Sequence, residues 1–222
     1  PEGEILYHKT IMDIFLENRL ENLVYGLGVF NRDPFHINDI EPALFNGPFW
    51  NKGDIFLSLR NISLVLQYRP ETGKVIKYLR GPFFYQHDID IISENKISIY
   101  NNNLRSTGHD GEGKNKIALH NEILLYDFET DQFSKLFNDK LIYLDIKSPA
   151  ESLADFAKDG AVLIEEHDYG RIVFLNKNGD LIWEFVNKSD NGKVYQPSWS
   201  RLITDEMLLK KLKSIIKGKK CD

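Results

Sequence analysis

The chain has 222 residues, of which 42% are hydrophobic and 27% are charged, a composition typical of globular proteins and not of disordered ones. A net charge of −5 argues against nucleic-acid binding through bulk positive charge. No apolar run approaches the roughly 18 residues that a membrane span needs. The single cysteine, Cys221, excludes a disulfide framework or a thiolate metal cluster within the chain.

The N-terminal part predicts one strand followed by helix. Residues 3–8 have the form of a strand that follows a turn at Gly3. Apolar residues between 10 and 25 recur at roughly helical spacing, with acidic and amide side chains between them. We interpret this segment as one amphipathic helix, or two short ones, inserted between strands, and its apolar stripe as a packing surface.

A repeat begins near residue 33. Each unit has a turn, an apolar strand, a second turn and second strand, and then a tight turn into a third strand that carries an aromatic residue. The units span residues 52–81, residues 94–103 continued by 121–138, and residues 158–187. A further predicted strand precedes each unit, at 36–44, 86–92 and about 152–157, which makes four strands per unit.

Four-stranded units repeated at this scale are the signature of a β-propeller. The predicted fold is therefore all-β, with a partial propeller of antiparallel four-stranded blades over residues 1–203, three of them complete. The segment 104–116 is Gly- and charge-rich and predicts a mobile surface loop. Residues 194–203 predict the first strand of one more blade, and residues 3–8 the outermost strand of a preceding one.

Three blades are too few to close a ring of the usual size, typically four to eight. We therefore expect that the chain is a C-terminal fragment or that upstream blades were lost. The region 204–222 predicts a C-terminal helix and a basic, solvated tail. Thr204 is the expected N-cap, and lysines concentrate towards the end of the helix, which suits the helix dipole.

Blade topology brings several polar residues to one opening of the channel. The start of a first strand lies beside the end of the antiparallel second strand. His36 starts a first strand, Arg60 ends the second strand of that blade, and His87 starts the first strand of the next blade. Asn38 lies two residues after His36 and points to the same side. Asn102 and His167 align with Arg60 in the following blades, so we consider them candidate substrate-binding residues.

The chemistry of this cluster suits transfer of a charged group better than metal hydrolysis. Arginine offers a planar, charged fork for an oxyanion such as sulfate or phosphate. One histidine can act as a nucleophile and another can move a proton. A structural role for each histidine is the alternative, and Arg60 could simply bridge two blades. A metal site of His36, His87 and His167 is conceivable, but the spacing has no metal signature, and we predict no cofactor.

With these residues identified, the sequence resembles the arylsulfotransferase family, whose members need no nucleotide sulfate donor. The resemblance covers most of residues 33–200. It rests on an ordered set of motifs: Asp33-Pro-Phe-His36-Ile-Asn38, Gly53-Asp-Ile-Phe-Leu-Ser-Leu-Arg60, Gln86-His87-Asp88 and Tyr100-Asn-Asn-Asn103. It implies a six-bladed propeller in which a histidine in the central channel takes a sulfuryl group from an aryl sulfate and passes it to a phenol.

By motif position, the resemblance makes His87 the nucleophile, with His36, Asn38 and Arg60 binding the sulfuryl oxygens and balancing charge. It also favours a periplasmic or secreted protein. The family uses a further histidine in an earlier blade, which has no counterpart here. Two other functions stay open: a non-catalytic propeller that binds an anionic ligand or a protein partner in the channel, and a propeller hydrolase or lyase that uses the same histidines with a metal.

Overall fold

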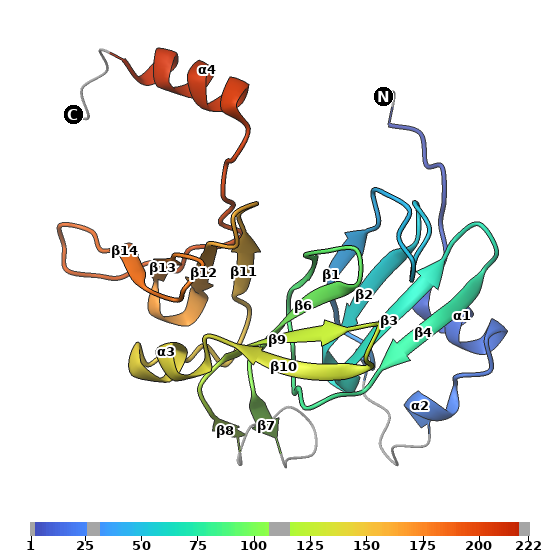
Figure 1. Cartoon of the computed structure of the whole chain (residues 1–222). Helices are drawn as coiled ribbons and strands as arrows, with labels where there is room; N and C mark the ends of the chain where they lie inside the picture. The colour runs from blue at the N-terminus through green and yellow to red at the C-terminus, as the bar shows by residue number, and fades with distance from the viewer. Residues whose placement is uncertain (1–2, 26–31, 107–115, 218–222) are drawn as a thin grey trace. The chain divides into compact units, whose positions relative to one another are not determined.

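The structure is a computed structural model that describes residues 3–25, 32–106 and 116–217 (Figure 1). The chain divides into two compact units, Pro1–Ser152 and Leu153–Asp222, and each is described by itself. That residues 1–203 form one propeller domain, followed by a C-terminal helix and tail, stays a prediction.

The first blade is a four-stranded antiparallel sheet in the order β1-β2-β3-β4. Its strands are β1 (Ile37–Pro42), β2 (Ile55–Leu59), β3 (Leu64–Arg69) and β4 (Lys74–Leu79). A short 3-10 helix, η1 (Arg60–Ile62), connects β2 to β3. The tight turn before β4 places Gly73 at φ +67°, a left-handed conformation that glycine adopts without steric cost.

The second blade has the same topology with an insertion between its second and third strands, and its order is β5-β6-β9-β10. Its strands are β5 (Ile89–Ile91), β6 (Lys96–Asn101), β9 (Glu122–Asp127) and β10 (Gln132–Leu136). Within the predicted surface loop, β7 (Leu104–Ser106) pairs with β8 (Lys116–Ala118) in a separate two-stranded sheet. The rest of that loop, with His109, lies outside the described residues.

The third blade makes up most of the second unit and has the order β11-β12-β13-β14. Its strands are β11 (Leu153–Phe156), β12 (Val162–Glu166), β13 (Arg171–Leu175) and β14 (Leu181–Val186). The 3-10 helix η2 (His167–Tyr169) follows β12 just as η1 follows β2. The described residues thus form three four-stranded antiparallel blades with the predicted strand order, which confirms the predicted fold class.

The two blades of the first unit share an apolar core. Buried side chains of the first blade, such as Trp50, Phe56 and Val65, pack in one cluster with Ile97 and Tyr126 of the second. Because apolar surface removed from water stabilises by roughly 25 cal/mol per Å², this cluster holds the ends of the neighbouring blades at a fixed spacing. That spacing sets the position of the polar residues at the strand ends.

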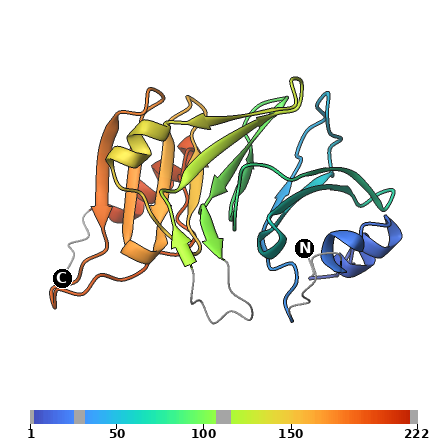
Figure 2. The same ribbon diagram turned by 90° about the horizontal axis from the view of Figure 1, so that it is seen from below.

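The predicted helical insertion consists of two short helices, α1 (Ile11–Glu17) and α2 (Asn22–Tyr25), which lie beside the first blade (Figure 2). Between them Arg19 adopts φ +58°, which interrupts helical geometry. Their buried residues pack against the apolar side chains of β2 and β3. The Asn18 side chain bonds the backbone of Gly73 and Val75 and so ties the insertion to the turn before β4.

Two predicted strands are wrong. Residues 3–8 form no strand, and the side chains of Ile5 and Leu6 are exposed. The hydroxyl of Tyr7 forms a hydrogen bond with the hydroxyl of Tyr68 at 2.6 Å. A strand needs a neighbour for its backbone groups, and none pairs with this segment among the described residues.

Residues 194–203 also form no strand beyond one bridge between Lys188 and Val194. Pro197 has no N–H for a ladder. The N–H groups of Ser200 and Leu202 instead donate to the carboxylates of Glu165 and Asp155, both at 2.6 Å. Side-chain acceptors therefore replace the neighbouring strand that the sequence pattern predicted.

The C-terminal helix is α4 (Glu206–Ile216), and its N-cap is Asp205 in place of the predicted Thr204. The Asp205 carboxylate accepts the N–H of Leu208 at 2.6 Å, and its negative charge favours the helix N-terminus. One further helix, α3 (Asn138–Tyr143), was not predicted. None of the helices in the described parts of the chain has the length and apolar character that crossing a membrane requires.

Candidate active site

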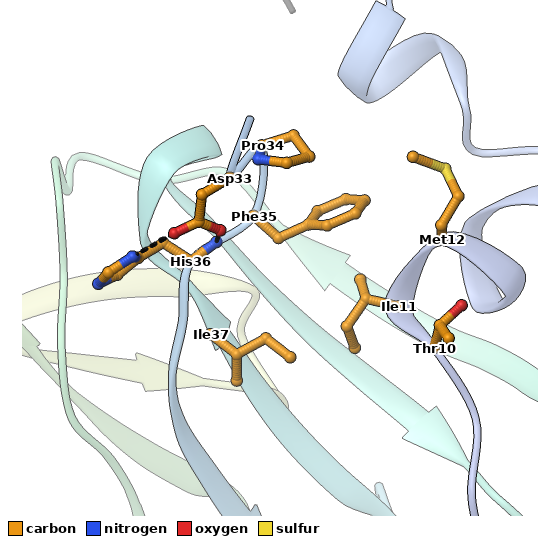
Figure 3. A pocket seen from close by; sticks show the side chains of 8 residues that line it. All are labelled: Thr10, Ile11, Met12, Asp33, Pro34, Phe35, His36 and Ile37. Carbon is orange, nitrogen blue, oxygen red and sulfur yellow. Dashed lines mark hydrogen bonds and ion pairs between the residues drawn. The ribbon is translucent and has the colours of Figure 1, made fainter. Parts of the chain in front are cut away.

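The turn that leads into β1 presents His36 on a backbone held by Asp33. The carboxylate of Asp33 accepts the backbone N–H of His36 at 2.9 Å and its Nδ1–H at 2.5 Å (Figure 3). These bonds favour the left-handed conformation of His36, φ +49°, which is uncommon for a non-glycine residue. Since the carboxylate occupies Nδ1, the Nε2 atom of His36 is the nitrogen that can take up or release a proton.

A pocket of about 530 Å³ lies on the other side of this turn, against α1. Its lining is mostly apolar, with Phe35, Ile37 and Met12 directed into it, whereas the His36 ring turns away (Figure 3). The pocket and the reactive face of His36 are therefore distinct.

Asn38 lies at an irregularity of the sheet. The β1–β2 register shifts between Ile37 and Asp39, which is a β-bulge around Asn38, and bulges redirect side chains near functional sites. Its Nδ2 donates to the backbone carbonyl of Gln86 at 2.8 Å. Its Oδ1 is buried and has no hydrogen-bond partner among the described residues. The bulge thus links the first strand of one blade to the residue before His87.

Arg60 begins η1 directly after β2, and its backbone N–H donates to the carbonyl of His36 at 3.1 Å. Its guanidinium lies 4.7 Å from the ring centre of Tyr85, and Nη1 donates to Asn61. Its Nε is buried without a partner among the described residues. Burial lowers the pKa of Arg60, and the charges of Tyr85 and Asp33 oppose this shift. An arginine pKa starts so high that the group stays cationic, so Arg60 is a partly buried cation whose Nε–H is free to donate.

His87 precedes β5 and is 7% exposed. Its Nδ1 lies 2.7 Å from Oδ1 of Asn102 and 3.2 Å from the carbonyl of Tyr85. Its Nε2 lies 3.1 Å from the backbone nitrogen of Glu151. An N–H can only donate, so Nε2 carries the lone pair and Nδ1 carries the proton. The orientation of the Asn102 amide agrees, because its Nδ2 donates to the carbonyls of Ser148 and Glu151, both at 2.8 Å.

The electrostatics keep His87 neutral. The pKa of His87 is lowered to about 4, chiefly by burial and also by the nearby charges of Arg60 and His36, while the hydrogen bonds that its Nδ1–H donates to Asn102 and Tyr85 oppose the shift. Near pH 7 the imidazole therefore retains a lone pair on Nε2. A neutral imidazole beside a fixed cation is suited to attack an anionic electrophile.

The structure places the four predicted residues near one another: the Arg60 N–H bonds the carbonyl of His36, Asn38 bonds the carbonyl of the residue before His87, and the charges of Arg60 and His36 act on His87. Asn102 joins them through its bond to His87. His167 belongs to the second unit, where its Nδ1 donates to the carbonyl of Pro197 at 2.6 Å.

Within its own blade His167 matches the predicted alignment, because it begins η2 as Arg60 begins η1. Across the ranges that the structure describes, no group of three or more His, Cys, Asp or Glu side chains is arranged to hold a metal ion.

Sequence reasoning missed three contributors to the site: the Tyr85 ring under Arg60, the N–H of Glu151 at His87, and the buried amide of Asn121 behind Asn102. Tyr85 directly precedes a recognised motif, so its aromatic ring was a usable signal. A backbone N–H carries no residue-type signal at all.

Three four-stranded antiparallel blades, with imidazole and guanidinium groups at strand ends of the first two, define a propeller-type protein. The chain belongs to the arylsulfotransferase (ASST) family, whose model matches residues 1–188. Among solved structures, the chain is similar to selenomethionine-substituted virginiamycin B lyase from Staphylococcus aureus, with 17% identity and a TM-score of 0.43. That match covers 73% of this chain and 45% of the other. No curated protein sequence matches the chain.

Proposed function

We propose that this chain carries the histidine site of an aryl sulfotransferase, which moves a sulfuryl group from an aryl sulfate ester to a phenol through His87. The observation that supports this most is the state of the His87 ring. Its proton is on Nδ1, where Asn102 accepts it at 2.7 Å, and the low pKa keeps a lone pair on Nε2 at neutral pH. A buried neutral imidazole with a defined tautomer is a prepared nucleophile.

In the first step the Nε2 lone pair forms a bond to sulfur as the bond between sulfur and the aryl oxygen breaks. The electron pair of the broken bond leaves on the aryl oxygen, and the ring becomes an N-sulfonated imidazolium whose positive charge offsets the sulfonate. In the second step a phenol gives its proton to Nε2 of His36, which lost one to the aryl oxygen in the first step, and the phenol oxygen attacks sulfur. The N–S bond then breaks, its electrons return to Nε2, and His87 is regenerated.

The other residues have separate roles in this proposal. Arg60 binds the sulfuryl oxygens, since its partly buried cation and unpartnered Nε donor are suited to a tetrahedral oxyanion. His36, held at Nδ1 by Asp33, exchanges a proton with the aryl oxygen through Nε2. Asn38 offers the second Nδ2 hydrogen to the sulfuryl group, or its buried Oδ1 to a phenol hydroxyl.

The predicted substrate-binding roles of Asn102 and His167 remain proposals. Both hydrogens of the Asn102 amide are used within the protein, so any contact of this residue with substrate requires these bonds to exchange. The proposed reaction needs no cofactor. A periplasmic or secreted location remains an expectation from the family.

The test is to incubate the protein with p-nitrophenyl sulfate and a phenol, following release of p-nitrophenol and formation of the new aryl sulfate. Mass spectrometry of a quenched sample should locate one sulfuryl group on His87. His87→Ala should abolish both signals. His120→Ala is the matched control, because the His120 ring pairs with Asp145, which has no role in the proposed reaction, and the variant should leave turnover unchanged. Unchanged turnover in His87→Ala would rule out the nucleophile assignment.

One observation favours the alternative of a non-catalytic site that binds an anion. The N–H of Glu151 occupies the His87 lone pair, so Nε2 is engaged in this structure. A protein of this second kind would bind an aryl sulfate with an affinity that depends on Arg60, without turnover and without sulfonation of His87. The same mass-spectrometric experiment separates the two functions.

A further inference from the structure

The side chain of Asn121 is 1% exposed, and both ends of its amide are fully engaged. Its Nδ2 donates to the backbone carbonyls of Asn102 at 2.9 Å and Ser148 at 3.1 Å. Its Oδ1 accepts the N–H of Ser148 at 2.6 Å and the hydroxyl of Tyr100 at 3.0 Å. Because Ser148 is held by both its N–H and its carbonyl, this one side chain fixes the backbone at the start of the segment 148–151.

The far end of the same segment meets His87. The carbonyl of Glu151 accepts from Nδ2 of Asn102, and the N–H of Glu151 donates to Nε2 of His87. Asn102 in turn accepts the Nδ1–H of His87. Each nitrogen of the imidazole is therefore bonded by one of these two groups, in addition to the Tyr85 carbonyl at Nδ1, and the Asn121 amide holds the backbone that carries both groups.

We propose that Asn121 is a positioning residue for His87, which holds Asn102 and the segment 148–151 so that the ring keeps its proton on Nδ1 and its lone pair on Nε2. Its significance for catalysis rests on the proposed function, but its effect on the ring does not. Asn121 acts on His87 through Asn102 and Ser148, whose backbone its amide bonds, and through Glu151 at the end of the segment that begins with Ser148.

The arrangement also has a consequence for the order of events. The N–H of Glu151 must leave the Nε2 lone pair before a bond to sulfur can form there. The displaced N–H then lies next to the incoming sulfuryl oxygens, where it can donate to them. Glu151 and Ser152 have φ values of +54° and +76°, which are unfavourable for non-glycine residues, so the segment needs external restraint of the kind that Asn121 supplies.

The test measures the ring directly. In protein labelled with ¹⁵N at histidine, the resonances of His87 should report a single tautomer with hydrogen on Nδ1, and hydrogen exchange should show a protected N–H at Glu151. In Asn121→Ala the ring should become a mixture of tautomers. Exchange at Glu151 should accelerate by about 10- to 100-fold, because the restraint on local opening is lost.

Two further variants make the result specific. Asn103→Gly is the matched control: it removes another buried asparagine side chain, which follows β6 and whose Nδ2 donates to the backbone carbonyl of His120, and it should leave the His87 resonances unchanged. Pro149→Gly loosens the segment without opening the core and should shift the ring in the same direction as Asn121→Ala. It provides the test should Asn121→Ala fail to fold.

The kinetic readout separates this proposal from the proposed function. In Asn121→Ala, kcat should fall by up to about 100-fold with little change in KM, because the nucleophile is misplaced while the substrate contacts remain. If Asn121→Ala or Pro149→Gly folds and keeps both the wild-type tautomer of His87 and the slow hydrogen exchange of the Glu151 N–H, the positioning role is overturned, whatever the activity of the variant. Altered resonances in a protein without sulfuryl transfer would keep the positioning role and overturn only the transferase assignment.

Discussion

The side-chain amide of Asn38 donates a 2.8 Å hydrogen bond to the backbone carbonyl of Gln86, the residue immediately before His87. Asn38 belongs to the first strand of one blade, and Gln86 lies at the entrance of the next. This bond therefore fixes the distance between the His36 side of the site and the His87 side. The β-bulge at Asn38 makes the bond possible, because it turns the side chain across the gap between the blades.

Asn38→Ala should lower the free energy of unfolding by about 1–3 kcal/mol, since it removes the donor from a buried carbonyl. The remaining donor to Gln86, the hydroxyl of Ser58 at 3.5 Å, is too distant to compensate. Chemical denaturation measures the change. Asn178→Ala, in an exposed turn, is the control and should change stability by no more than about 0.5 kcal/mol. Equal effects of the two changes would contradict the linking role.

His87 should make the protein less stable as the pH falls. Its pKa is lowered by burial from 6.5 to about 4. Above pH 6.5 the ring is neutral in both the folded and the unfolded chain and contributes no pH dependence. Between pH 6.5 and about 4 the unfolded chain binds a proton that the folded protein does not, so the free energy of unfolding falls, by on the order of 3 kcal/mol in all.

Comparison with His87→Gln isolates this contribution, because the other titrating groups are common to both proteins. Urea denaturation at pH 7 and pH 4 should show a larger loss of stability in the wild type than in the variant. Parallel losses would mean that His87 titrates normally in the folded protein.

The blade pattern could be predicted from the sequence because each turn carries its own residue signal and each buried strand is a short apolar run. The two wrong strands, 3–8 and 194–203, have strand-like composition, but composition does not reveal whether a partner strand is present. In the second of them the carboxylates of Glu165 and Asp155 take the N–H groups that a ladder would use. Such a contact joins residues 35 and 47 positions apart and leaves no local signal.

The sequence predicts those contacts of the site that follow from the order and direction of the strands. His36 and Arg60 are neighbours because antiparallel strands begin and end together, and the 3.1 Å backbone bond between them follows from that rule. The immediate environment of His87 was not predictable. Its Nε2 partner is a backbone N–H 64 residues away, on a segment held by the buried amide of Asn121.

Arg60→Gln should reduce the rate of sulfuryl transfer by about 10²- to 10³-fold, the usual effect of losing a donor to a developing oxyanion. Arg60→Lys should recover only part of the rate, because a lysine lacks the planar fork. Loss of the Arg60 charge should also raise the pKa of His87, since that charge lowers it in the wild type. An NMR titration checks this effect independently of activity.

Arg80→Gln, which removes an exposed arginine of the same unit, serves as the control and should leave both the rate and the titration unchanged. An Arg60→Gln protein with wild-type turnover would show that the guanidinium of Arg60 only joins the blades, which was the structural alternative for this residue.

Arg69→Met should be among the most destabilising surface-accessible changes in the first blade. The Asp54 side chain is fully buried, and it accepts from Nε of Arg69 at 2.6 Å and from Nη2 at 2.8 Å. Removing the arginine leaves a buried carboxylate without its cation, which costs about 3–5 kcal/mol. Lys96→Met, which breaks the half-exposed 3.2 Å pair with Asp127, should cost at most about 1 kcal/mol in the same denaturation experiment. If the two losses were equally small, the bonds from Gln67 and from the Asn51 N–H would be enough to hold the Asp54 charge.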